Sequence, residues 1–178
     1  MYIFDNYLFY LTFQPSFMAL AYLLLGSNMG HSQSLLSIAA DHIQQLVGPI
    51  KAQSSIYISD AWGKEDQNPF LNQVISIETS LSAAHLLKSL FQIEQQMGRI
   101  RSVKWGARII DIDILFYDNE KIQLDALTIP HPAIADRRFT LIPLHEIAPY
   151  YTHPVYQKTI AWLLENCQDP LGVKLLED

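Results

Sequence analysis

Two aspartates separated by one isoleucine are the residues of this chain best placed to do chemistry. They are Asp111 and Asp113, in the segment IIDIDILFY (109–117), which has the apolar, β-branched character of a strand. Because strand side chains alternate between two faces, both carboxylates are predicted to lie on one face, with their Cα atoms about 7 Å apart. The alternating isoleucines and Phe116 are predicted to point the other way, toward the helices and the core.

This aspartate pair predicts a divalent-metal site. Carboxylates this close repel each other unless a cation lies between them. Oxygen ligands on a rigid strand suit Mg²⁺, which takes one or two carboxylates and completes its shell with phosphate oxygens and water. The alternative is a solvated strand face with two unpaired acids, because the D-x-D pattern is short and common.

A basic segment lies immediately before this strand. Arg99, Arg101, Lys104 and Arg108 fall within GRIRSVKWGAR (98–108). Guanidinium groups bind phosphate oxygens in a bidentate manner, and arginines beside metal-binding carboxylates recur in phosphoryl transfer. A solvated charged loop is the alternative. The chain has no Walker-type loop and no protein-kinase signature, so side chains would have to hold the phosphates.

Two further groups of residues fit an anion and a flat heterocycle. His131 and Arg137, in PHPAIADRRF (130–139), would complete an anion site, although a single surface histidine is more often structural. Aromatic side chains stack well on planar rings, although most belong to the core. Asn72 can read the edge of such a ring, since its amide both donates and accepts. The aromatic candidates are Trp62, Phe70, Trp105 and Phe139.

Composition and charge narrow the classes of function. The chain has 178 residues, of which 49% are apolar and 17% charged, and this predicts one globular domain and excludes a disordered protein. The net charge of −6 argues against nucleic acid as a partner, whereas a locally basic site suits a small anion. A single cysteine, Cys167, excludes an intrachain disulfide and fits a reducing, cytoplasmic compartment.

Residues 1–18 are predicted to be an appendage to a domain that occupies 19–178. The segment is rich in aromatics but lacks the basic start and the cleavage site of a secretory signal. Asp5, Asn6 and Pro15 interrupt its apolar run, which is too short to span a bilayer. The sequence assigns this segment no role.

Hydrophobic periodicity predicts the element order β-α-β-β-α-β. Ser32 and Ser82 are expected to cap the two helices, and Gly98 to end the second. This order is typical of an α+β ferredoxin-like sandwich, in which an antiparallel sheet carries two helices on one face and leaves the other face free for a site. A proline-rich C-terminal third adds extra elements, including a helix near 156–167. The expected strands lie near 19–25, 52–58, 71–79 and 109–117.

The spaced motifs resemble the 6-hydroxymethyl-7,8-dihydropterin pyrophosphokinase family of folate biosynthesis. The resemblance implies a transferase that moves pyrophosphate from ATP to the pterin alcohol with two Mg²⁺ ions and releases AMP. It further implies a monomer that binds neither nucleic acid nor membrane. The matching segments are WGARIIDIDIL (105–115), YLLLGSN (22–28), SSIY (54–57), FLN (70–72) and HP…DRRF (131–139).

The resemblance also implies roles for individual residues. Asp111 and Asp113 would bind the metal ions, Arg99 and Arg108 would be catalytic, and Gly26 and Asn28 would shape the floor of the site. The segment SDAWG (59–63) departs from the family pattern because it lacks prolines often found there. The residues implied to bind ATP are Glu94, Arg99, Arg101, Trp105, Arg108, His131 and Arg137. Those implied to bind the pterin are Ser59, Trp62, Phe70, Asn72, Trp105 and Phe139.

Two other functions stay open from the residues alone. A ferredoxin-like sheet also serves as a platform for single-stranded RNA, although acidic residues on the exposed face argue against that partner. A regulatory module would bind ATP without releasing AMP.

Overall fold

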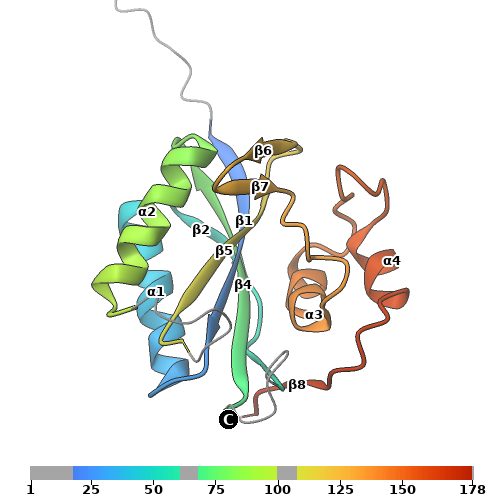
Figure 1. The fold of residues 1–178 in the computed structure, drawn as a ribbon, viewed down its shortest axis with the longest axis horizontal. Coiled ribbons are helices and arrows are strands. Elements are labelled where there is room, and N and C mark those ends of the chain that lie inside the picture. Colours follow the sequence, from blue (N-terminus) through green and yellow to red (C-terminus); the bar gives the residue numbers. More distant parts are fainter. Residues whose placement is uncertain (1–17, 61–67, 100–107, 178) are drawn as a thin grey trace, which may run out of the picture.

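The computed structural model describes residues 18–60, 68–99 and 108–177. These residues form three layers: two helices, a β-sheet, and a C-terminal layer with two further helices (Figure 1). The helices are α1 (Ser32–Leu46), α2 (Ala83–Gln96), α3 (Arg138–Ile147) and α4 (Ile160–Glu165). The strands are β1 (Ala19–Ser27), β2 (Ile50–Gln53), β3 (Tyr57–Ser59), β4 (Phe70–Thr79), β5 (Asp111–Tyr117), β6 (Ile122–Leu124), β7 (Leu127–Ile129) and β8 (Val173–Leu175).

The main sheet is six-stranded, and β1 lies inside it. The strand order is β5-β1-β4-β3-β8, with β2 also paired to β4, and every pairing is antiparallel. β1 is buried almost throughout because neighbouring strands and both outer layers cover it, which suits its continuous apolar run. The predicted α+β fold and its β-α-β-β-α-β order are confirmed, except that the predicted strand 52–58 is divided into β2 and β3.

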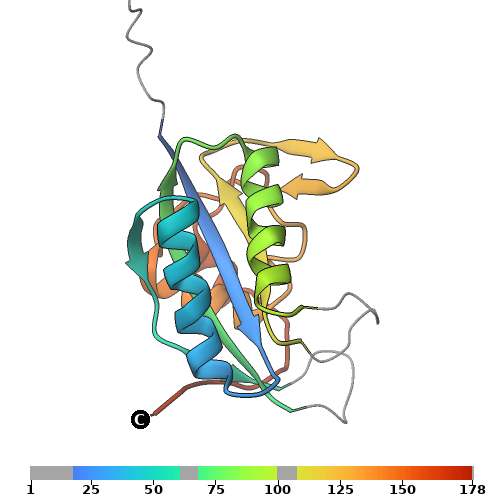
Figure 2. The same cartoon turned by 90° about the vertical axis from the view of Figure 1, so that its left-hand side faces the viewer.

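Helices α1 and α2 lie side by side on one face of the sheet (Figure 2). Ser82 caps α2, since its hydroxyl accepts from the backbone N–H of His85 at 3.4 Å. Ser32 does not cap α1 as predicted, because it is already the first helical residue and its hydroxyl lies 2.9 Å from that of Ser27. The apolar faces of both helices pack on the sheet through Leu36, Ala39, Ile43, Leu86, Leu90 and Ile93.

The second face of the sheet is partly covered, contrary to the prediction that it stays free. α3 packs against β3, β4 and β8, and α4 packs against α3. Leu141, Leu144 and Ile160 from this layer are fully buried against the sheet. The C-terminal third therefore builds a second core, and an RNA-binding platform loses the open sheet face that it needs.

A bulge in β5 changes the direction of its last side chains. Ile114 pairs with Leu23 and Phe116 with Tyr22, so Leu115 is an extra residue between the two pairs. Phe116 therefore packs in the second core, 6.1 Å from the Tyr22 ring, and the prediction that it faces the helices is wrong. The isoleucines before the bulge do face the helices as predicted.

The lone cysteine belongs to the second core, whereas nearly all of the predicted N-terminal appendage is not described. Cys167 is a buried free cysteine. Residues 1–17, nearly all of the predicted appendage, lie outside the described residues. Among the helices formed by residues 18–60, 68–99 and 108–177, none is long and apolar enough to cross a membrane.

His153 is a buried histidine that links the C-terminal layer to the sheet. Its side chain is 3% exposed and its ring lies 5.3 Å from that of Phe116. Its Nδ1 accepts from the backbone N–H groups of Val155 and Tyr156 at 3.2 and 3.3 Å. Burial lowers the pKa of His153 to about 4, so the folded chain holds the neutral imidazole.

The free energy of unfolding is expected to fall as the pH drops from about 6.5 toward 4, because the unfolded chain protonates His153 before the folded chain does. The loss reaches up to about 3 kcal/mol at ~1.36 kcal/mol per pKa unit. His153→Asn keeps an acceptor near the Nδ1 position but cannot titrate, so its unfolding energy should fall less over this range. Urea unfolding of both proteins between pH 7 and 5 measures the difference. If the free energy of unfolding depends equally on pH in the two proteins, the lowered pKa assigned to His153 is contradicted.

Candidate active site

Asp111 and Asp113 lie on the face of the sheet opposite α1 and α2. Asp113 pairs with Leu24, and Asp111 pairs with Gly26 on the neighbouring strand β1. Directly opposed residues share a face of the sheet, and Leu24 belongs to the second core. Both carboxylates are half-buried, so they lie beyond the covered part of this face but near its apolar wall.

Gly26 separates the aspartates from a buried amide. Register places Asp111, Gly26 and Asn72 in one row across β5, β1 and β4. A side-chain carbon on Gly26 would stand 3.6 Å from Oδ1 of Asn72. Because glycine has no side chain, the strip of sheet between Asp111 and Asn72 carries no side chain on this face.

Both carboxylate oxygens of Asp111 are paired with arginines in this structure. Arg99 Nη1 lies 2.5 Å from Oδ1, and Arg108 forms an ion pair with Oδ2. The Arg99 and Asp111 side chains are 13% and 16% exposed, so solvent screens their attraction only weakly. The basic segment and the aspartate strand therefore meet as the sequence suggested.

Glu94 is a buried carboxylate at the end of α2. It is 1% exposed, accepts from the backbone N–H of Ile112 at 2.9 Å and forms an ion pair with Arg99. A buried charge is costly without such partners. Glu94 therefore anchors both the start of β5 and the Arg99 guanidinium.

The end of α2 brings Arg99 back to Glu94. Gly98 has φ +88°, a left-handed conformation that favours glycine. The N–H of Gly98 donates to Gln95 O at 3.0 Å and that of Arg99 to Glu94 O at 2.9 Å, the pair of bonds that defines a Schellman motif. The predicted helix end at Gly98 thus places the first residue of the basic segment.

Asn28 joins three segments beneath the site. It is 3% exposed, and its backbone N–H donates to Arg108 O at 3.1 Å. Its side-chain Oδ1 accepts from Arg108 N–H at 2.7 Å, and its Nδ2 donates to Asn68 O at 3.2 Å. The ends of β1, the basic segment and the approach to β4 are therefore held together by one amide.

His131 faces the same site from the segment after β7. Its Nδ1 accepts from Ala133 N–H at 3.2 Å, so the neutral ring carries its proton on Nε2. Burial lowers the pKa of His131, the Asp113 charge opposes this shift, and Arg137 adds to it. The neutral ring can therefore donate from Nε2 to an anion beside Asp113.

The residues implied to bind a pterin come from two layers. Asn72 is buried and its Nδ2 donates to Ser59 Oγ at 2.9 Å. Phe70 pairs with Ser59 and shares the face of Asn72, because it lies two residues earlier on β4. Phe139, the second residue of α3, comes from the C-terminal layer, with the Arg137 guanidinium 5.6 Å from its ring.

A cavity of about 400 Å³ gathers six of the charged candidates, but Arg137 is not among its lining residues. They are Glu94, Arg99, Arg108, Asp111, Asp113 and His131. Its other wall comprises Leu87 and Phe91 of α2 and residues 125–128 of the β6–β7 hairpin, which the sequence reasoning missed. Periodicity gave no sign of this wall, because apolar helix residues and a short hairpin carry no motif. Arg101, Trp105 and Trp62 lie outside the described residues.

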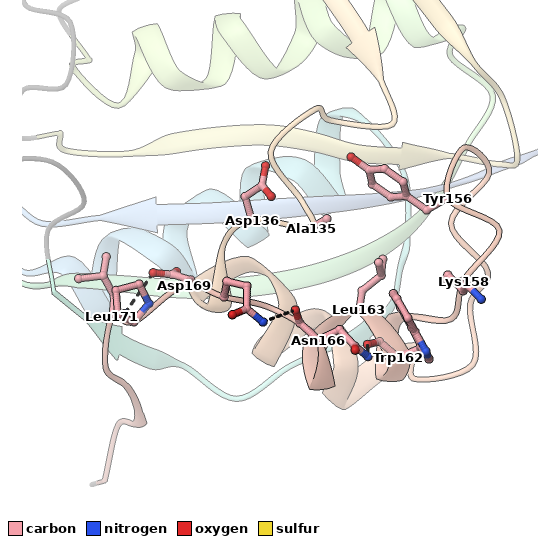
Figure 3. A pocket seen from close by; sticks show the side chains of 11 residues that line it. Ala135, Asp136, Tyr156, Lys158, Trp162, Leu163, Asn166, Asp169 and Leu171 are labelled. Carbon is pink, nitrogen blue, oxygen red and sulfur yellow. Dashed lines mark hydrogen bonds between the residues drawn. The ribbon is translucent and has the colours of Figure 1, made fainter.

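A larger cavity of about 870 Å³ lies at α4, away from these residues (Figure 3). Its wall is mainly apolar and aromatic, with Tyr156, Trp162 and Leu163 among its residues. The Asp169 carboxylate at its edge accepts from Arg138 N–H and Leu171 N–H. Its described lining contains no arginine, so the smaller cavity is the better candidate for binding phosphate.

The donor set of the smaller cavity fits Mg²⁺. Within residues 18–60, 68–99 and 108–177 there is no group of three or more His, Cys, Asp or Glu side chains arranged to hold a metal. Mg²⁺ needs no such cage, because one or two carboxylates with phosphate oxygens and water complete its shell. Asp111 and Asp113 supply such a pair.

Comparison with known proteins identifies the family. A sequence model described as 7,8-dihydro-6-hydroxymethylpterin-pyrophosphokinase (HPPK) matches residues 22–149. A 2-amino-4-hydroxy-6-hydroxymethyldihydropteridine pyrophosphokinase of Aquifex aeolicus is 42% identical over 80% of this chain and 89% of its own length. One of the same name from Methylorubrum extorquens is 41% identical over 90% of this chain and 100% of its own length.

Solved structures agree on the fold. Wild-type Plasmodium falciparum HPPK-DHPS matches with a TM-score of 0.65 at 18% identity, over 84% of this chain and 44% of the longer one. The chain thus spans less than half of that solved protein. The sequence matches show that the chain belongs to the 7,8-dihydro-6-hydroxymethylpterin-pyrophosphokinase family, and its reaction is pyrophosphoryl transfer to hydroxymethyldihydropterin in folate biosynthesis.

Proposed function

We propose that Asp111 and Asp113 bind two Mg²⁺ ions together with the triphosphate of ATP. The single observation that carries this proposal is their common face beside Arg99, Arg108 and His131 in one cavity. The metal ions, when bound, neutralise triphosphate charge and polarise the phosphorus under attack. Asp111 and Asp113 would hold these ions, while Arg99, Arg108 and His131 would bind phosphate oxygens.

Arg99 and Arg108 exchange partners when the nucleotide binds. Both guanidinium groups rest on Asp111 in this structure. Phosphate oxygens offer them equivalent charge-assisted bonds, and their transfer leaves the Asp111 oxygens to the metal ions. Glu94 keeps one side of Arg99 in place during this exchange. The nucleotide and the metal ions therefore bind cooperatively.

The pterin occupies the open strip above Gly26. Asn72 is oriented by Ser59, so its Oδ1 can accept from the ring edge. Phe70 and Phe139 stack on the two ring faces, and the family resemblance assigns Trp62 and Trp105 to the pterin and Arg101 to ATP. The hydroxymethyl oxygen then attacks the β-phosphorus and AMP leaves. Positioning and electrostatics provide most of the acceleration, with no dedicated side-chain base.

The enzyme acts as a cytoplasmic monomer, with one catalytic domain over 19–178. The buried free Cys167 fits a reducing compartment. The acidic net charge of −6 argues against nucleic acid as a partner.

AMP release tests the reaction. The protein is incubated with ATP and Mg²⁺, with and without 6-hydroxymethyl-7,8-dihydropterin, and nucleotides are separated by chromatography. AMP should form only with the pterin alcohol and should stop when EDTA removes the metal. Binding of ATP without AMP release, by folded protein with Mg²⁺ present, would instead indicate a nucleotide-binding module.

Asp113→Asn tests the metal assignment. The variant keeps size but loses the charge that holds a cation, so turnover should fall by at least about 1000-fold, or ~4 kcal/mol. Glu120→Gln, at an exposed turn residue, is the matched control and should keep wild-type turnover. Steady-state AMP formation at saturating substrates gives the comparison. Near-normal turnover of Asp113→Asn would refute the assignment.

Glu94→Gln tests the anchor of Arg99. The amide still accepts from Ile112 N–H but no longer balances the guanidinium charge, so the KM for ATP should rise by about tenfold. Glu165→Gln, an exposed glutamate at the end of α4, serves as control. An unchanged KM for ATP in folded Glu94→Gln would remove Glu94 from the nucleotide site.

A further inference from the structure

The chain between β2 and β3 contains one residue more than the strand opposite it. Gln53 pairs with Ile75 and Tyr57 with Asn72. Residues 54–56 therefore face only residues 73–74 on β4, which is the count of a β-bulge. Regular ladder bonds are interrupted here, so the backbone groups of this segment need other partners.

Side chains provide several of those partners, while within the backbone Ser54 N–H donates to Val74 O and Ile56 O accepts from Leu176 N–H. Ser54 Oγ accepts from Val74 N–H at 3.0 Å, and Gln73 Nε2 donates to Ser54 O at 2.8 Å. The N–H of Ser55 turns to the other layer and donates to both carboxylate oxygens of Glu146, at 3.1 and 3.0 Å. The bulge is therefore tied to β4 on one side and to α3 on the other.

Glu146 accepts two further bonds at the same place. Ser55 Oγ donates to it at 2.9 Å, and Tyr57 Oη donates at 3.0 Å. Glu146 lies in the last turn of α3, where the helix dipole disfavours an acid. Burial raises the pKa of Tyr57 most, and the bond to Glu146 raises it further, so the phenol keeps the proton that it donates. The Glu146 carboxylate is therefore stabilised by residues of the bulge and of β3 rather than by its own helix.

We propose that Glu146 is a positioning residue that sets the separation of the two walls of the pterin site. The inference rests on the proposed roles of Ser59, Asn72 and Phe139. Glu146 and Phe139 lie on the same helix, while Tyr57 and Ser59 lie on the same strand. The four bonds to Glu146 thus join the Phe139 wall to the Ser59 wall.

β3 is held in the sheet by β4 on one side and by β8 on the other, and the Glu146 bonds attach it to α3 as well. It is three residues long and its outer neighbour β8 is also three residues long. Tyr57 is in register with Asn72 and Ser59 with Phe70. Any shift of β3 therefore moves Ser59 away from the Asn72 amide that it orients at 2.9 Å. The ATP side has no such dependence, since its residues come from α2, β5 and the segment after β7.

Ligand titrations with full-length protein test the proposal. Dissociation constants for 6-hydroxymethyl-7,8-dihydropterin and for a non-hydrolysable ATP analogue are measured on wild type, Glu146→Ala, Glu146→Gln and Tyr57→Phe. Glu146→Ala should raise the dissociation constant for the pterin by about tenfold. It should leave the dissociation constant for the ATP analogue within about twofold of the wild-type value. Tyr57→Phe removes one of the four bonds and should cost less, and Glu146→Gln should restore part of the affinity by accepting from Ser55 N–H.

Matched variants separate positioning from general stability. Glu165→Ala removes an exposed helix-terminal glutamate and should change neither affinity. The double variant Glu146→Ala/Tyr57→Phe should bind pterin no worse than Glu146→Ala alone, because the second change removes a bond already lost. If Glu146→Ala does not fold, Glu146→Gln and Tyr57→Phe must still weaken binding of the pterin more than binding of the ATP analogue.

Two outcomes would overturn the inference. The first is that folded Glu146→Ala binds the pterin with wild-type affinity. The second is that Glu146→Ala weakens binding of the pterin and of the ATP analogue equally, since this would indicate a general structural role. Asn72→Ala distinguishes these from a failure of the proposed pterin site. If Asn72→Ala weakens pterin binding and the Glu146 variants do not, only the positioning role fails. If Asn72→Ala also has no effect, the pterin site itself lies elsewhere.

Discussion

The charge balance around Asp111 is the constraint on which the rest of the site depends. Glu94 and Asp111 meet Arg99 and Arg108 at the junction of α2 and β5, in a setting that is buried or only partly exposed. Burying the carboxylates there without the guanidinium groups, or the reverse, would cost too much free energy. A ligand that enters must therefore replace the ion pairs it breaks, and a polyphosphate accompanied by cations brings both signs at once.

The second face of the sheet carries the second hydrophobic core on one part and the candidate site on another. The C-terminal layer covers the part beside β3 and β4 and builds a second core there. Gly26 leaves the next strip open between Asp111 and Asn72. The two walls of that strip belong to different layers, so their separation depends on contacts between layers, of which the Glu146 bonds to Ser55 and Tyr57 are the most direct.

Much of this arrangement could be predicted because it follows from local rules. Alternation along a strand put Asp111 and Asp113 on one face, and the glycine after α2 ended that helix where Arg99 begins. Apolar periodicity located both helices of the first layer and the strands that they cover. The prediction for Phe116 was wrong because the same alternation fails across the bulge at Leu115.

The sequence by itself determined the element order, the aspartate face and the family motifs, because each depends on residues close together in the chain. Only the tertiary structure decided where β5 bulges, that the C-terminal third covers part of the face that carries the site, and that the β6–β7 hairpin forms one wall of the charged cavity. Ser55 and Glu146, 91 residues apart, show the reason. A hydrogen bond between distant segments depends on how whole layers pack, and no local pattern in the sequence records that.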